Sequence, residues 1–342
     1  MPRRASSPDQ LPLFMAVSTP LPAPTVAGAV VSAELTAVAQ SLPRHLYLGT
    51  SSWTFPGWVG LVYDRATTTQ QLARQGLAAY AQHPLLRTVG IDRTYYAPLA
   101  TADFAVYAAA VPDDFRFLVK AHELCTLAYF TSRGRYAARR GERNPLFLDP
   151  GYATEQVIGP CVEGLGNKAG PVLFQFPPQD VHTLGGPEHF AERLHAFLSA
   201  LPRGVLYAVE LRNAALLTPA YCNALAATGT CHCFNVHPSM PSLQEQQRHL
   251  SSSHPPALIV RWMLHPTQRY EAAAARYQPF DRLVDEDPGN RNAIAALCVQ
   301  TVQAGRPAFV IVNNKAEGSA PLTVGKLAER VAQTLCKTHR HP

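Results

Sequence analysis

The chain has 342 residues, of which 47% are hydrophobic and 16% charged, and its 30 Lys and Arg against 24 Asp and Glu give a net charge of +6. This composition is typical of a globular protein and excludes a disordered chain. It also excludes a membrane span, because no run approaches the roughly 18 consecutive apolar residues that a span requires. The seven cysteines are scattered, which indicates buried thiols in a reducing compartment; we therefore expect a cytoplasmic protein without membrane partners.

The first segment, residues 1–43, is rich in Pro, Ala, Ser and Thr, which predicts a flexible extension. Within it, QLPLF at residues 10–14 resembles the short bacterial motif by which DNA-processing proteins bind the replication sliding clamp. The contact would be made by Gln10, Leu11, Leu13 and Phe14. The motif predicts the sliding clamp as a partner.

The remainder, residues 44–338, reads as one domain in which eight short apolar runs alternate with amphipathic stretches. Runs this apolar are typical of parallel strands that are buried on both faces, and eight of them predict a closed (β/α)8 barrel of the TIM type. The competing arrangement is a doubly wound open sheet, but no glycine-rich phosphate turn follows the first run. The runs are residues 45–50, 85–91, 115–121, 170–176, 205–211, 230–236, 257–263 and 308–314.

Nearly every run ends in polar or aromatic residues. In barrel enzymes the carboxyl ends of the strands carry the chemistry, so polar side chains are expected to concentrate there. The residues that we expect at this end of the barrel are Ser51, Trp53, Asp92, Tyr95, Lys120, His122, Gln175, Glu210, Arg212, His237, Arg261, Asn313 and Asn314.

The same strand ends carry a family resemblance. The motifs are GTSSWTFPGW, VGIDRTYYAP, DFRFLVKAH, GPVLFQFPP, AVELRN and VNNKAEGSAP, which occur in this order. Together they resemble the YecE-like family, also called domain of unknown function 72, over residues 45–335. The resemblance implies a bacterial cytoplasmic TIM-type barrel of unestablished activity. The chain departs from the family pattern at the second strand, where a glutamate and an asparagine are common and this chain has Gly90 and Asp92.

Five strand-end residues, Lys120, Gln175, Glu210, Arg261 and Asn313, would combine two cations, a carboxylate and two amides in the barrel mouth. Such a set suits a small anionic or polyhydroxylated substrate, because guanidinium groups grip anions and amides orient hydroxyls. The alternative is a structural network in which Lys120 pairs with Glu210.

If the mouth is an active site, we expect one group of residues in catalysis and another in substrate binding. The catalytic candidates are Glu210 as general acid/base, Lys120 as base or nucleophile, Asp92 and His122. The substrate-binding candidates are Arg261, Asn313, Asn314, Gln175, Arg212, Trp53, Tyr95 and Ser51. Hydrolysis, isomerisation and lyase chemistry all remain open.

A divalent metal is the one cofactor for which the sequence offers ligand types. His122, Glu210 and His237 would be the ligands, although no short two-histidine spacing supports such a site. Cys231 and Cys233 flank a histidine in an apolar run, and we interpret them as buried core cysteines.

An insertion near residues 130–148 contains five arginines within eleven residues, namely Arg133, Arg135, Arg139, Arg140 and Arg143. They would contact phosphates, or they form a solvated face. With QLPLF they define a second hypothesis, a nucleic-acid-binding or phosphodiester-processing protein recruited to the clamp. A third hypothesis is a barrel that binds a ligand without catalysis.

Overall fold

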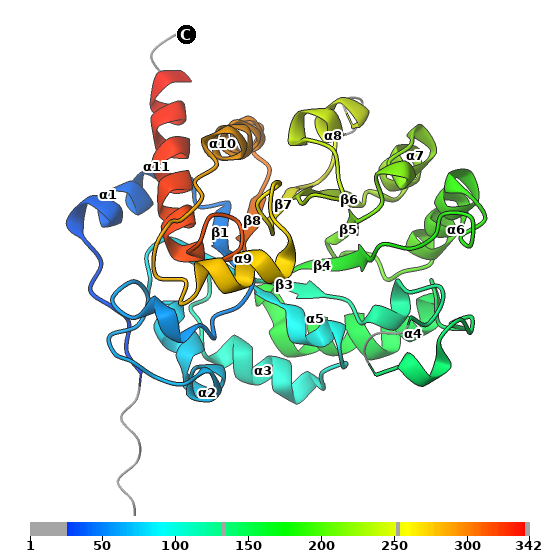
Figure 1. Cartoon of the computed structure of the whole chain (residues 1–342), viewed down its shortest axis with the longest axis horizontal. Coiled ribbons are helices and arrows are strands. Elements are labelled where there is room, and N and C mark those ends of the chain that lie inside the picture. Colours follow the sequence, from blue (N-terminus) through cyan, green and yellow to red (C-terminus); the bar gives the residue numbers. More distant parts are fainter. Residues whose placement is uncertain (1–25, 132–134, 251–253, 339–342) are drawn as a thin grey trace, which may run out of the picture.

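The computed structural model describes residues 26–131, 135–250 and 254–338. Eight parallel strands pair in sequential order and close into a barrel, which confirms the predicted fold class (Figure 1). Each strand begins and ends within about two residues of the predicted run. The strands are β1 (Leu46–Thr50), β2 (Leu86–Ile91), β3 (Arg116–Lys120), β4 (Ala169–Phe176), β5 (Tyr207–Leu211), β6 (Cys231–Val236), β7 (Leu258–Trp262) and β8 (Ala308–Val312).

Helices cover the outside of the barrel and bury one apolar face against it. In α2 this face consists of Leu72, Leu77, Tyr80 and their neighbours. The helix begins where the Thr68 hydroxyl accepts a hydrogen bond from the Gln71 N–H. The helices are α1 (Ala33–Ser41), α2 (Thr69–Tyr80), α3 (Thr101–Ala109), α4 (Pro150–Ala153), α5 (Gly159–Leu165), α6 (Pro187–Ser199), α7 (Pro219–Thr228), α8 (Leu243–His249), α9 (Tyr270–Tyr277), α10 (Pro288–Gln303) and α11 (Ala320–Thr338).

The interior of the barrel is a separate small core. It is built from alternate residues of the strands, as the period of two requires. The two cysteines of β6, Cys231 and Cys233, belong to this core, which confirms their interpretation. The buried members are Leu118, Leu173, Ala208, Cys231, Cys233, Ala257, Ile259, Phe309 and Ile311.

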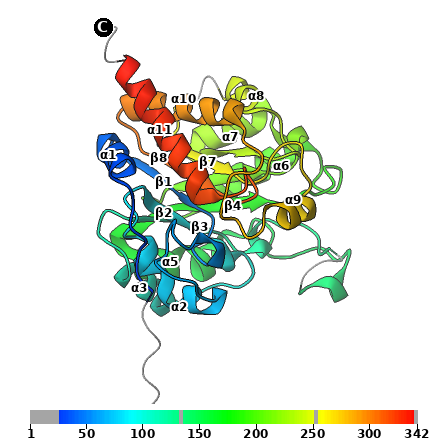
Figure 2. The same ribbon diagram turned by 60° about the vertical axis from the view of Figure 1, so that its left-hand side comes forward.

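The segment before the barrel differs from the predicted flexible extension. Residues 26–43 contain α1, and the Ser32 hydroxyl accepts a hydrogen bond from the Leu35 N–H at its start. The Ala29 N–H donates to the carbonyl of Val62, and α1 packs against α11 (Figure 2). Local composition does not reveal this order, because contacts with distant parts of the chain provide it. The QLPLF motif lies outside the described residues.

No helix in the described part of the chain is long and apolar enough to cross a membrane.

Candidate functional site

The candidate site is one layer of side chains above the interior core, at the carboxyl ends of the strands. Each member follows a core residue by two positions, so period-two alternation points it into the barrel. The strand register places Gln175 beside Glu210 and Asn235 beside Arg261. The layer contains Lys120, Gln175, Glu210, Asn235, Arg261 and Asn313.

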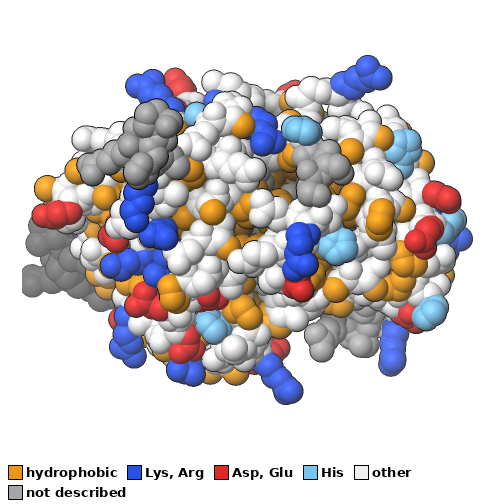
Figure 3. Space-filling model, turned by 90° about the horizontal axis from the view of Figure 1, so that it is seen from above, with side chains coloured by type: hydrophobic (Ala, Val, Ile, Leu, Met, Phe, Trp, Pro, Cys, Tyr) orange, Lys and Arg blue, Asp and Glu red, His pale blue; other side chains and the backbone are white. Residues whose placement is uncertain are grey.

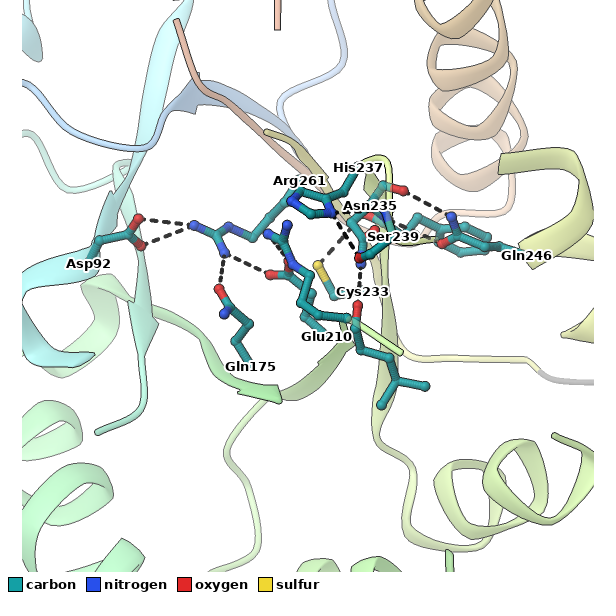
Figure 4. Close-up of polar contacts among 12 residues, drawn as sticks. Asp92, Gln175, Glu210, Cys233, Asn235, His237, Ser239, Gln246 and Arg261 are labelled. Atoms are coloured by element: carbon teal, nitrogen blue, oxygen red, sulfur yellow. Dashed lines mark hydrogen bonds and ion pairs between the residues drawn. The ribbon is translucent and has the colours of Figure 1, made fainter. Parts of the chain in front are cut away.

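Arg261 is the centre of this layer (Figure 4). Its Nη1 donates to Glu210 Oε2 at 2.7 Å and to Gln175 Oε1 at 3.2 Å. Its Nη2 donates to both carboxylate oxygens of Asp92, at 3.0 and 3.2 Å. The side chain is 1% exposed, and Asp92 and Glu210 keep its pKa above the usual value although burial opposes this. Asp92 thus supplies a carboxylate at the second strand, where the family pattern differs.

Glu210 is held by two arginines. One oxygen accepts from Arg261, and the other forms an ion pair with Arg212, two residues further along the chain. Burial alone would raise the pKa of the Glu210 carboxyl, but Arg212 and Arg261 outweigh burial and lower the pKa to about 2. A carboxylate with both oxygens paired is a poor proton donor near neutral pH. The geometry therefore favours a positioning role over the predicted role as general acid/base.

Lys120 differs from the arginines because it forms no ion pair with any described residue. Its side chain is 8% exposed, and Nζ lies 3.7 Å from the centre of the Tyr95 ring. Burial is the main reason that the pKa of Lys120 falls to about 8; the negative charges of Asp92 and Glu210 oppose this fall, and the positive charges of Arg261 and Arg212 add to it. The predicted structural pair between Lys120 and Glu210 is not formed, because Arg212 and Arg261 occupy both oxygens of that carboxylate.

The two asparagines after β8 separate. Asn313 Nδ2 donates to Ser51 Oγ at 2.9 Å, so these two predicted residues meet at the β8–β1 side of the mouth. Asn314 points the other way. Its Oδ1 accepts from Trp58 Nε1 at 3.1 Å and from the Ala320 N–H at 2.8 Å, which ties the loop to the start of α11.

The predicted metal ligands do not come together. His122 Nδ1 lies 2.7 Å from the Tyr152 hydroxyl, and His237 Nδ1 lies 2.8 Å from Ser239 Oγ. Both carboxylate oxygens of Glu210 are paired with arginines. Over the three described ranges, no group of three or more His, Cys, Asp or Glu residues is arranged to hold a metal ion.

Trp53 lies beside the site with its indole turned into the fold. It is 5% exposed, and Nε1 donates to the carbonyl of Leu72 at 3.1 Å. A cavity of about 240 Å³ adjoins it, between the ends of β1 and β2. Asp92 and Ser51 line both this cavity and the mouth, so the cavity extends the site toward α2 and α3.

The described arginines of the insertion, Arg135, Arg139, Arg140 and Arg143, are exposed; Arg133 lies outside the described residues. Arg139 pairs with Glu142 at 2.8 Å. Arg135 is close enough to the mouth to act on His122: burial is the main cause of the lowered pKa of His122, and the positive charge of Arg135 lowers it further. Elsewhere, on the face drawn in Figure 3, basic side chains are dispersed among acidic and apolar ones.

Some features of the site were not predicted from the sequence. The contact between His122 and Tyr152 joins residues 30 positions apart and has no local signal. The pairing of Arg212 with Glu210 does have one, because residues two positions apart at a strand end share a face.

The fold and the site together define a class, the TIM-type barrel proteins with a charged and amide-lined mouth at the carboxyl ends of the strands. Within this class the chain belongs to the DUF72 family, described as proteins of unknown function, whose family model matches residues 47–342. The family resemblance seen in the strand-end motifs is thereby confirmed.

Solved structures of the family have the same fold. A DUF72 family protein from Enterococcus faecalis is 16% identical with a TM-score of 0.52, over 84% of this chain and 95% of that one. A DUF72 family protein from Thermotoga maritima is 19% identical with a TM-score of 0.52, over 86% and 99% of the two chains. A comparison with curated proteins finds no match.

Proposed function

We propose that the protein is an enzyme that binds a small anionic, sugar- or phosphate-like molecule in the barrel mouth, with Lys120 as the residue that contacts the anion. The observation that carries this proposal is the buried, unpaired ammonium of Lys120. Of the three cations in this cluster, Arg212 and Arg261 form ion pairs with Glu210 and Asp92, whereas Lys120 forms none with any described residue; Glu123 is close enough to interact with its charge but is not in direct contact. An anionic ligand would give Lys120 a direct partner.

The surrounding residues support binding of a ligand that also carries hydroxyl groups. Arg261 orients Gln175 by donating to its Oε1, which leaves the amide nitrogen of Gln175 as a donor. Asn313 and Ser51 form a second polar pair at the β8–β1 side. Glu210 keeps both arginines in place, so that their charges act on the mouth from fixed positions.

Lys120 also has properties that a catalytic lysine needs. With a pKa of about 8, roughly a tenth of the side chain would be the neutral amine at pH 7. A neutral amine in a desolvated pocket accepts protons and attacks carbonyl groups, whereas a lysine of ordinary pKa is almost fully protonated. We assign proton transfer or nucleophilic attack to Lys120 rather than to Glu210.

The proposal is tested by titrating inorganic phosphate and glycerol phosphate into the protein by calorimetry at constant ionic strength. The unpaired Lys120 is replaced in Lys120→Met, and the control is Lys326→Met, which removes a half-exposed lysine that pairs with Glu329 at 3.6 Å. We expect Lys120→Met to lose about tenfold or more in affinity, because a charge-assisted hydrogen bond contributes about 1.5–3 kcal/mol. The control should bind as the wild type does.

Wild-type affinity for the anion should also fall as the pH rises above about 8, where Lys120 loses its proton. Equal affinity of Lys120→Met and wild type would refute the proposal. Turnover of a panel of phosphorylated and carboxylated sugars, followed by NMR, then separates an enzyme from a barrel that only binds its ligand.

A further inference from the structure

A second buried lysine lies at the opposite side of the mouth. Lys315 belongs to the loop between β8 and α11, and its main chain is fixed at both polar groups. Its N–H donates to Asn313 Oδ1 at 3.0 Å, and its carbonyl accepts from the His265 N–H at 2.9 Å. The residue is therefore held between the loops that follow β7 and β8.

The ammonium group of Lys315 has aromatic neighbours but no carboxylate. The side chain is 6% exposed, and Nζ lies 4.3 Å from the centre of the Tyr270 ring and 5.8 Å from that of Phe280. Within the described ranges it forms neither an ion pair nor a side-chain hydrogen bond. Contact with aromatic rings attracts the charge but leaves the three N–H donors of an ammonium without acceptors.

The nearby carboxylates are already paired with other groups. Glu317, two residues further along, accepts from Arg291 Nη2 at 2.6 Å and from the Asp287 N–H at 2.6 Å. Asp285 accepts from Arg276 and from the Tyr277 hydroxyl, each at 2.7 Å. The second oxygen of Glu317, Oε2, is buried without a hydrogen-bond partner, and no ion pair joins Glu317 to Lys315 among the described residues. An anion from outside the chain would give Lys315 the partner that these acids do not provide.

Lys315, like Lys120, lies at the end of the barrel where the strands have their carboxyl ends. Its neighbour Tyr270 is 57% exposed and, after burial and Asp92, contributes to the raised pKa of Tyr96. Tyr96 contacts Tyr95 edge to face at 5.4 Å, and Tyr95 carries Lys120 on its ring. Tyrosine rings thus lie beside both lysines, and Tyr270 is close enough to Tyr96 for their charges to interact. The two lysines follow β8 and end β3, which are three strands apart in the closed barrel.

We propose that Lys315 forms a second anion subsite, so that the ligand of the mouth carries two separated anionic groups, phosphate or carboxylate, one bound at each lysine. This inference rests on the proposed function, because it takes the first anion to lie at Lys120. The loops after the seventh and eighth strands are a frequent phosphate site in barrels of this type, and the position of Lys315 agrees with that tendency.

The test uses linear alkanediol bisphosphates with three, four and six carbons, and methyl phosphate as the matched single anion. Each is titrated by calorimetry into wild type, Lys315→Met, Lys120→Met and the surface control Lys326→Met at constant ionic strength. At least one bisphosphate should bind the wild type about tenfold or more tightly than methyl phosphate does, since a second charge-assisted contact adds at least that factor. The chain length that binds best reports the spacing of the subsites.

Lys315→Met should bind that bisphosphate only as tightly as methyl phosphate, and its affinity for methyl phosphate should stay within about twofold of the wild type. Lys315→Arg keeps the charge and should retain the preference for the bisphosphate, which guards against a loss caused by misfolding. The inference is overturned if no bisphosphate exceeds methyl phosphate in the wild type, or if Lys315→Met keeps the preference. If Lys120→Met binds methyl phosphate with the same affinity and the same number of sites as the wild type, the proposed function itself fails.

Discussion

Replacing Lys120 by methionine should make the folded protein more stable, because the lysine is a buried charge without a partner. Its pKa falls from 10.5 to about 8 on folding. At about 1.4 kcal/mol per pKa unit, this shift corresponds to a penalty of about 3 kcal/mol for keeping the lysine charged in the native state. Methionine fills a similar volume without a charge, so we expect the free energy of unfolding to rise by about 1–3 kcal/mol at pH 7.

The pH dependence of this gain has a definite sign. Below about pH 8 both states carry the proton, and the whole penalty applies. Between about 8 and 10.5 the native lysine loses its proton while the unfolded one keeps it. The unfolded state then binds more protons, and wild-type stability rises with pH in that window. The difference between Lys120→Met and wild type should therefore shrink from pH 8 to pH 10.5.

Urea denaturation at pH 7, 9 and 10.5 measures the difference, with Lys326→Met as the control. That lysine is half exposed, so its removal should change the free energy of unfolding by no more than about 0.5 kcal/mol. A Lys120→Met protein that is less stable than the wild type at pH 7, or a difference that does not vary with pH, would show that Lys120 stabilises the barrel. The reasoning about an unpaired cation would then be wrong.

Three further predictions concern other parts of the chain. Glu210→Gln should lower the free energy of unfolding by about 3–5 kcal/mol, since it leaves two buried arginines without a carboxylate partner. In urea denaturation the wild type should lose this stability as the pH falls from 4.5 to about 2, where the Glu210 carboxylate becomes protonated. If the stability of Glu210→Gln falls with pH in the same way as that of the wild type, the prediction is wrong. Gly57→Ala should lower the melting temperature, because a Cβ there would lie 1.7 Å from the Pro279 carbonyl oxygen, whereas Gly289→Ala, with no atom nearer than 3.5 Å, should be tolerated. Deleting residues 1–20 should abolish any binding to the sliding clamp in a pull-down and leave the melting temperature unchanged; retained binding would exclude QLPLF as the contact.

Much of the fold could be predicted because it depends on local patterns. Apolar runs and polar strand ends both follow from burial on two faces and from the period of two along a strand. The same alternation indicates the directions of two neighbours in the sequence. Ile311 lies in the interior core, so Asn313 points inward and Asn314 outward, as the structure shows.

The roles of the charged residues were harder to predict, because they depend on which of several possible partners each side chain contacts in the folded structure. Lys120 and Glu210 are both in the mouth, yet the arginines occupy the carboxylate and leave the lysine unpaired. This outcome is decided by side-chain length and strand register across the barrel, which one sequence does not display. The helix at Ala33–Ser41 was missed for a related reason, since its stability comes from contact with the far end of the chain.

That helix and the residues before it also affect how the barrel closes between its last and first strands. The β8–β1 seam joins strands about as far apart in sequence as the domain allows, so forming it carries the largest loop-closure entropy of any strand pair. On the β1 side of the seam, the Gly28 N–H donates to the side-chain Oε1 of Gln82 and the Ala29 N–H donates to the Val62 carbonyl; on the β8 side, α1 packs against α11. Residues 26–41 therefore connect the two sides of the β8–β1 seam. A fragment that begins at residue 44 would keep all eight strands but lose these contacts across the seam.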